Sequence, residues 1–187
     1  MQKTNLSQIV SVAENLTCHA IDQVNQKWEY LCGAMLNVKD AVARIPERIE
    51  RESAEERFGK LCIELEKLEI AKRRMDERFF DLLGGELLLT DATMKLMGVE
   101  GELTLTRGEE GVADTLEKIC ALRIRVEEYA RMHTQKRAQL EQLIRRTLPH
   151  FLDEVYRVSD CERNGKGFRM QSLAALCGGL CNEIKIP

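Results

Sequence analysis

The sequence predicts an all-α fold in which long helices form an elongated antiparallel bundle or coiled coil, followed by a C-terminal helical hairpin. Apolar residues recur at steps of three and four over most of the chain, a spacing that keeps one face of a helix apolar. The composition agrees, because 32% of the residues are charged, 5% are aromatic and three are prolines. A length of 187 residues is enough to bury a sizeable core in one elongated unit with a small appendage.

The first predicted helix spans residues 6–45. Its apolar positions are Leu6, Ile9, Ala13, Leu16, Ala20, Val24, Trp28, Leu31, Met35, Val38 and Val42. Trp28 is the only tryptophan, and on this grid we expect it to anchor the core and bury on the order of 200 Å². An exposed Trp28 would instead mark a partner-binding hot spot. Pro46 cannot donate a backbone hydrogen bond, so we expect a break or a new helix there.

The second predicted helix spans residues 47–83. Phe58, Leu61, Leu65, Leu68, Met75, Phe79 and Leu82 follow the same spacing. Lys72 takes the position at which the grid expects another apolar residue, and a charged residue at such a position often sets register or partner choice. Gly84 and Gly85 are expected to end this helix.

Residues 85–111 are predicted to form an irregular, glycine-rich and acidic insertion. The segment 85–90 (GELLLT) is echoed by 101–106 (GELTLT), and the second copy alternates apolar and polar residues as a strand does. A small β-hairpin and a short helix at 92–97 flanked by loops are both compatible with this pattern.

The third predicted helix spans residues 112–148, and Pro149 is expected to end it. Arg123 and Arg137 occupy two positions of its apolar grid, where acidic residues of a partner could satisfy them. His133 also falls on the grid. We expect a buried, hydrogen-bonded histidine there, and a pH-sensitive interface residue is the alternative.

The tail, residues 150–187, is predicted to be a separate helix–turn–helix hairpin appended to a bundle of residues 1–149. A core of about forty residues rarely suffices alone, so the hairpin should dock on something. Its apolar candidates for such a contact are Phe168, Leu173, Leu176 and Leu180.

The turn of this hairpin resembles the first half of an EF-hand loop. Asp160, Glu162, Asn164 and Gly165 stand at the first, third, fifth and sixth positions of that loop. The twelfth position is Gln171, where calcium binding requires a bidentate glutamate. The resemblance therefore implies at most a degenerate hand, and a plain hairpin with an Asn-Gly turn is the interpretation that we favour.

Two cysteines of the last predicted helix, Cys177 and Cys181, could supply zinc ligands, with His150 and Cys161 as distant additions. The spacing is not that of a zinc knuckle. We interpret these cysteines as packing residues and expect no metal site.

Enzyme classes that can be identified from a short sequence motif find little support. The chain has no G-x-S-x-G, H-E-x-x-H or Walker motif, and it has only three histidines. We therefore expect a non-enzymatic protein without a cofactor. A net charge of −3 gives no electrostatic reason to expect a nucleic acid as partner.

The location expected from the sequence is the cytoplasm, with the nucleus as alternative. No run of about 18 apolar residues is present, and the first residues lack the apolar core of a secretory signal. Seven scattered cysteines without a C-x-x-C pair are typical of reduced thiols.

The function expected from these patterns is that of a structural subunit of a multiprotein complex, such as a cytoskeletal, kinetochore-like or tethering assembly. We expect other helical proteins as partners, in a hetero-oligomer. The candidate contact residues are Trp28, Lys72, Arg123, His133, Arg137, Phe168, Leu173, Leu176 and Leu180. The alternative is a small regulatory module that binds a target through the degenerate EF-hand-like hairpin.

Overall fold

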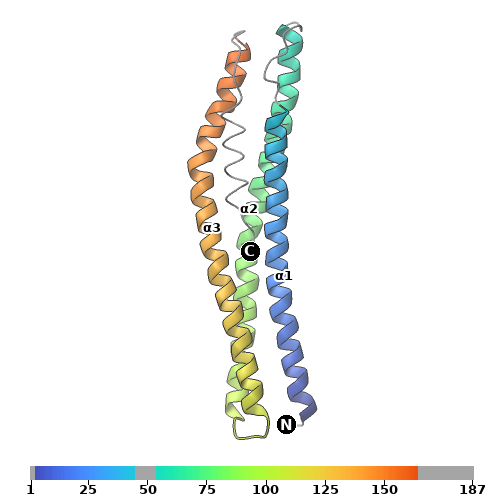
Figure 1. The fold of residues 1–187 in the computed structure, drawn as a ribbon, viewed down its shortest axis with the longest axis vertical. Coiled ribbons are helices and arrows are strands. Elements are labelled where there is room, and N and C mark those ends of the chain that lie inside the picture. The colour runs from blue at the N-terminus through green and yellow to red at the C-terminus, as the bar shows by residue number, and fades with distance from the viewer. Residues whose placement is uncertain (1–2, 45–53, 164–187) are drawn as a thin grey trace. The chain divides into compact units, whose positions relative to one another are not determined.

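The chain folds into three long helices in a computed structural model that describes residues 3–44 and 54–163 (Figure 1). Helix α1 spans Lys3–Ala43, α2 spans Ala54–Leu105 and α3 spans Val112–Arg163. The described residues contain helices and turns without a strand, which confirms the predicted all-α class. The predicted break at Pro46 lies outside the described residues. No helix within the described ranges is both long enough and apolar enough to cross a membrane.

Residues 85–105 belong to α2, so the predicted end at Gly84-Gly85 and the irregular insertion are wrong. Gly85 faces α1: a methyl group built on it would lie 3.2 Å from Val24 Cγ2. The glycine permits a close approach of two helices there. The threonines that gave 85–106 its strand-like pattern donate their hydroxyls back to the helix, Thr90 to Glu86 O at 2.9 Å and Thr104 to Glu100 O at 2.7 Å.

A short turn joins α2 to α3. The Thr106 hydroxyl donates to Leu103 O at the end of α2, and the Glu109 N–H donates to Thr106 O. Gly111 has a φ of +82°, a left-handed conformation that side chains other than glycine rarely adopt. This turn lets α3 fold back along α2.

Helix α3 continues through Pro149 to Arg163, so the predicted helix end at Pro149 is wrong. Proline removes one backbone hydrogen bond, but its fixed φ is close to the helical value, so a long helix can continue at a cost of about 3 kcal/mol. The predicted domain boundary at 149/150 therefore falls inside a helix. Residues 160–163 of the EF-hand-like motif are helical, and the rest of it lies outside the described residues.

The helices contribute to two compact units, each with one stretch of every helix. The first unit comprises Met1–Lys27 and Asp81–Arg137, and the second comprises Trp28–Phe80 and Ala138–Pro187.

In the first unit, α2 is antiparallel to both other helices. Glu100 contacts Arg123 and Glu86 contacts Arg137, so residue numbers fall along α2 as they rise along α3. Asn25 of α1 accepts a hydrogen bond from the hydroxyl of Tyr129 of α3. The buried residues include Leu6, Ala13, Ala20 and Val24 of α1, Leu82, Leu89, Ala92, Leu96 and Leu103 of α2, and Val112, Ile119, Val126 and His133 of α3.

In the second unit, Trp28 is 5% exposed, which confirms its predicted place in the core. Leu31, Met35, Val38, Leu61, Leu68, Ala71, Met75 and Leu140 are buried in the same unit. Ala71 fills the core position that the sequence pattern assigned to Lys72. Lys72 lies at the edge of the core, where its long apolar stem can pack while the ammonium reaches Asp76 at 2.9 Å.

The helical glycines of α2 provide a test of the packing. Replacing glycine by alanine in a helix gains up to about 1 kcal/mol of intrinsic helix propensity. Nothing lies within 4 Å of a methyl group built on Gly98, so we expect Gly98→Ala to raise the free energy of unfolding. Gly85→Ala places its methyl 3.2 Å from Val24 and should come out about 1–2 kcal/mol less stable than Gly98→Ala. Urea unfolding of the two variants measures this difference, and equal stabilities would contradict the close approach of α1 and α2.

Candidate interaction surface on α2

The part of α2 in the first unit, residues 81–105, is apolar on two opposite sides. The inner side faces α1 and α3 and includes Leu82, Leu89, Leu96 and Leu103, each at most 3% exposed. These four residues recur every seven positions, as expected for a helix face buried along its whole length.

The second apolar side consists of Leu83, Leu87, Thr90, Met94, Met97, Gly101 and Leu105, which we name the outer stripe. Its members follow one another at steps of four, three, four, three, four and four residues. At 100° per residue the outer stripe points roughly 135° away from the inner side. Leu87 is 72% exposed, Met94 64% and Leu105 88%. The helix therefore has a second apolar face that the described residues of the first unit leave uncovered.

The outer stripe lies in a surface with few charges. Among the exposed residues of 81–105, the charged ones are Asp91, Lys95 and Glu102. Lys95 Nζ lies 2.7 Å from Asp91 Oδ2 on the next turn, so these two charges offset each other. The exposed face of this segment is consequently close to neutral.

Two arginines of α3 fix the rotational orientation of α2 about its own axis. Arg137 Nε donates to Glu86 Oε1 at 2.7 Å, and Arg123 Nε donates to both carboxylate oxygens of Glu100 at 2.8 and 3.0 Å. The hydrogen bonds that Arg123 donates to the Glu100 and Glu127 carboxylates raise the pKa of its guanidinium above its ordinary value. Any rotation that buried the outer stripe against α1 or α3 would separate both Arg–Glu pairs and expose the inner leucines.

His133 lies between these two pairs in the core. It is buried, with Nε2 3.3 Å from Leu82 O, which confirms the prediction of a buried, hydrogen-bonded histidine. Burial lowers the pKa of His133, because the charged imidazolium loses its hydration, and the neighbouring Arg137 lowers it further. The carboxylate of Glu86 and the bond to Leu82 O act in the opposite direction.

The sequence-derived contact candidates lie in several places, and their role at an interface stays a prediction. Arg123 and Arg137 find their acidic partners on α2 of the same chain rather than on another chain. Lys72 pairs with Asp76 of its own helix. Phe168, Leu173, Leu176 and Leu180 lie outside the described residues.

The outer stripe was not predicted from the sequence. Its signal was present, since Leu83, Leu87, Met94 and Met97 have helical spacing, but the interpretation of 85–111 as irregular hid it. The glycines at 84, 85, 98 and 101 caused that interpretation.

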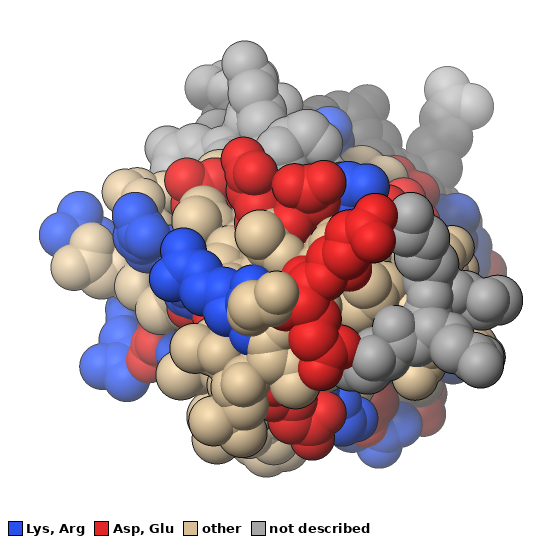
Figure 2. All heavy atoms as spheres, turned by 90° about the horizontal axis from the view of Figure 1, so that it is seen from below, with Lys and Arg blue, Asp and Glu red and all other residues tan. Residues whose placement is uncertain are grey.

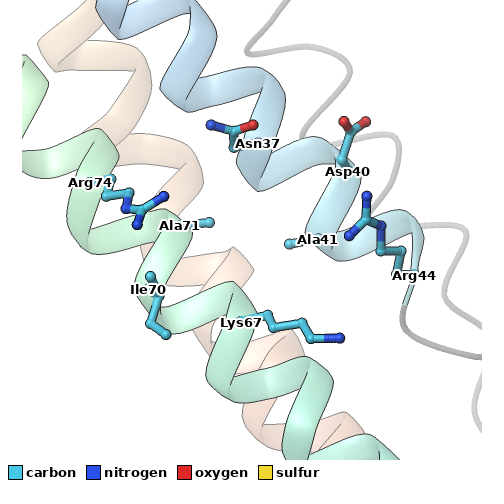
Figure 3. A pocket seen from close by; sticks show the side chains of 8 residues that line it. All are labelled: Asn37, Asp40, Ala41, Arg44, Lys67, Ile70, Ala71 and Arg74. Carbon is cyan, nitrogen blue, oxygen red and sulfur yellow. The ribbon is translucent and has the colours of Figure 1, made fainter.

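A shallow pocket of about 250 Å³ lies between α1 and α2 in the second unit (Figure 3). It is lined by Asn37, Asp40, Ala41 and Arg44 of α1 and by Lys67, Ile70, Ala71 and Arg74 of α2. Lys67 lies at the α2 side of this pocket and pairs with Glu64. The lining carries three cationic side chains, one carboxylate from Asp40, and the apolar side chains of Ala41, Ile70 and Ala71.

Metal ligands are not gathered either in the part of the chain that the structure describes. Over the described residues, no group of three or more His, Cys, Asp or Glu side chains could hold a metal ion. Figure 2 shows acidic, basic and uncharged side chains mixed over the face that it views, with the acidic ones forming the larger group.

No protein-family model, curated protein or solved structure matches this chain. A proposal for its function therefore depends on its own surface.

The Arg123–Glu100 contact can be tested by removing the guanidinium. Arg123→Met leaves the Glu100 carboxylate, a group that is 17% exposed, without its partner, so we expect a loss of about 1–3 kcal/mol in the free energy of unfolding. The matched control is Arg145→Met, because the pair of Arg145 with Glu141 is exposed and should contribute less than about 0.5 kcal/mol. Chemical denaturation measures both, and equal losses would contradict a special role of Arg123.

The lowered pKa of buried His133 predicts that the free energy of unfolding depends on pH. Its pKa in the folded protein lies below the unfolded value, so the unfolded chain takes up the proton first as the pH falls. The stability that neutral His133 contributes is complete above the ordinary histidine pKa of about 6.5 and is lost as the pH falls below it. We expect His133→Gln to reduce the difference in unfolding free energy between about pH 7.5 and 5.5.

The control for this experiment is His19→Gln, because His19 is exposed and should leave the pH dependence as it is in the wild type. A His133→Gln variant with the full wild-type pH dependence would show that other groups cause it.

Proposed function

We propose that this protein is a non-catalytic assembly subunit that binds a helix of another chain along the outer stripe of α2. The observation that supports this proposal is the exposure of a second apolar face, with Leu87 72% and Leu105 88% exposed, opposite a face that is already buried. A helix that is apolar on opposite sides is typical of one that packs between two neighbours.

Burial of the outer stripe offers a sizeable driving force. Removing apolar surface from water contributes about 25 cal/mol per Å², so each large side chain of the stripe can contribute on the order of 1–2 kcal/mol when it is covered. Soluble proteins rarely expose contiguous apolar patches without a binding role. The low charge of the surrounding surface favours the same role, because few charges would need to be dehydrated.

The spacing of the stripe favours a helix as the bound element. Steps of three and four residues form the ridges that fit between the side chains of a second helix, as in a coiled coil. Gly98 and Gly101 are open to solvent, with nothing within 4 Å of a methyl group built on either. Each glycine destabilises the helix by about 1 kcal/mol relative to alanine. A glycine at an exposed helical position is explained if the backbone of a partner helix approaches closely there.

The proposed setting is a complex in the cytoplasm or the nucleus. Two of the described cysteines, Cys18 and Cys62, are exposed thiols outside any disulfide. Exposed free thiols suit a reducing compartment.

Site-specific photo-crosslinking in the cells that make the protein tests this proposal. A photoreactive residue at Met94 should form crosslinks to another polypeptide, because the proposed partner covers this position. The same residue at Glu128, an exposed position of α3, is the matched control and should give few or none. Absence of intermolecular crosslinks from Met94, or equal crosslinking from Glu128, would refute the proposal.

A further inference from the structure

We infer that the outer stripe binds a second copy of itself, with the two α2 helices antiparallel about a two-fold axis near Met94. This inference rests on the proposed function and names its partner. It follows from the symmetry of the stripe, from the charges beside it and from the size of its members.

The outer stripe reads almost the same in both directions from Met94. Leu83 and Leu105 each lie eleven residues from it, and Leu87 and Gly101 each lie seven residues from it. In an antiparallel pair, a residue on one side of the axis meets the residue at the same distance on the other side. Leu83 then meets Leu105 of the second copy, and Met94 meets its own counterpart.

The sizes of the opposed residues are complementary. Leu87, which projects into solvent, would lie over Gly101 of the second copy, where the helix surface is hollow and a methyl group would meet nothing. Thr90 would lie beside Met97 in the same way, a small residue against a large one. Such alternation lets two helices interdigitate.

The charges beside the stripe favour the same arrangement. Asp91 and Lys95 lie on one flank of the stripe, on either side of the level of the proposed axis. Because the same flanks of two antiparallel helices face each other, Asp91 of each copy comes near Lys95 of the other. These charges already pair within one helix at 2.7 Å, and the second copy adds a reciprocal pair. A copy in the parallel orientation would instead set this flank against the opposite flank of the other helix, so Asp91 would not meet Lys95.

The length of the stripe predicts a weak dimer. It covers roughly 33 Å at about 1.5 Å per residue, and a helix-to-helix contact of that length buries on the order of 1,000 Å², the lower end of specific interfaces. We therefore expect a dissociation constant on the order of 10–100 µM.

Sedimentation velocity of the purified full chain, from about 1 µM to about 300 µM, tests the dimer. The wild type should pass from monomer to dimer, and Leu87→Glu with Met94→Glu should weaken the association by at least about 100-fold. The matched control is Ile124→Glu, an exposed apolar residue of α3 outside the stripe, which should associate as the wild type does. Circular dichroism checks that each variant stays helical. A wild type that remains monomeric over this range, or a dimer that the double substitution leaves unchanged, would overturn the inference.

Charge exchange between two copies tests the orientation. Asp91→Lys and Lys95→Asp should each weaken self-association by about 5-fold or more, because each brings like charges together across the axis. An equimolar mixture of these two variants should associate about as strongly as the wild type, since the opposite charges then meet between chains. Neither variant keeps the pair within its own helix, so a recovery in the mixture cannot come from that pair. Failure of the mixture to recover would overturn the reciprocal contact.

Gly101→Ala separates the interface from the stability of the monomer. The methyl group meets open space in one chain, so helix stability should rise, while the contact with Leu87 of the second copy should weaken by several-fold. Unchanged association would count against the antiparallel alignment.

The outcomes also separate this inference from the proposed function. A monomeric chain that still crosslinks from Met94 to a different protein refutes the second copy but supports the proposed function. A monomeric chain whose Met94 crosslinks to residues 164–187 of its own chain refutes both.

Discussion

The two Arg–Glu pairs between α3 and α2 are the constraint on which the first unit depends. Arg123 and Arg137 lie fourteen residues apart, and so do their partners Glu100 and Glu86, so the pairs fix both register and rotation at the two ends of the contact. Hydrophobic packing alone is not directional and would allow a helix with two apolar sides to present either one to the core. The charged pairs select the side that faces the core. With the inner side buried, both carboxylates keep their guanidinium partners, whereas burial of the outer stripe would separate them.

In this orientation the two apolar sides of α2 have different roles. Its inner side stabilises the unit through Leu82, Leu89, Leu96 and Leu103, while its outer stripe contributes little to the stability of a single chain. Evolution can change such a surface without unfolding the protein. The acidic residues of this segment are distributed accordingly. Glu86 and Glu100 accept hydrogen bonds from arginines of α3, and the exposed face of 81–105 has only three charged residues.

The sequence predicted the class of the fold and most of the buried positions, because steps of three and four residues directly encode which face of a helix is apolar. Trp28 and His133 lie where their grid positions placed them. It failed at Gly84-Gly85, where the local preference for a helix end yields to the packing of Gly85 against Val24, and at Pro149, through which α3 continues. It also assigned Arg123 and Arg137 to another chain, since spacing within one helix does not show which neighbour supplies the opposite charge. The candidate surface could have been found only by extending the helical pattern across the glycines.

The topology of the first unit also has a consequence for the order of folding. The contacts between α2 and α3 join residues close in sequence, such as Glu100 and Arg123, which are 23 residues apart, whereas Tyr129 and Asn25 are 104 residues apart. Contacts between near residues cost less chain entropy and form sooner. During synthesis α1 leaves the ribosome first, yet its contacts with both α2 and α3 are complete only after α3 has been made. The apolar face of α1 is therefore uncovered for as long as the ribosome takes to make the other two helices, and this interval is when the chain most needs protection from aggregation.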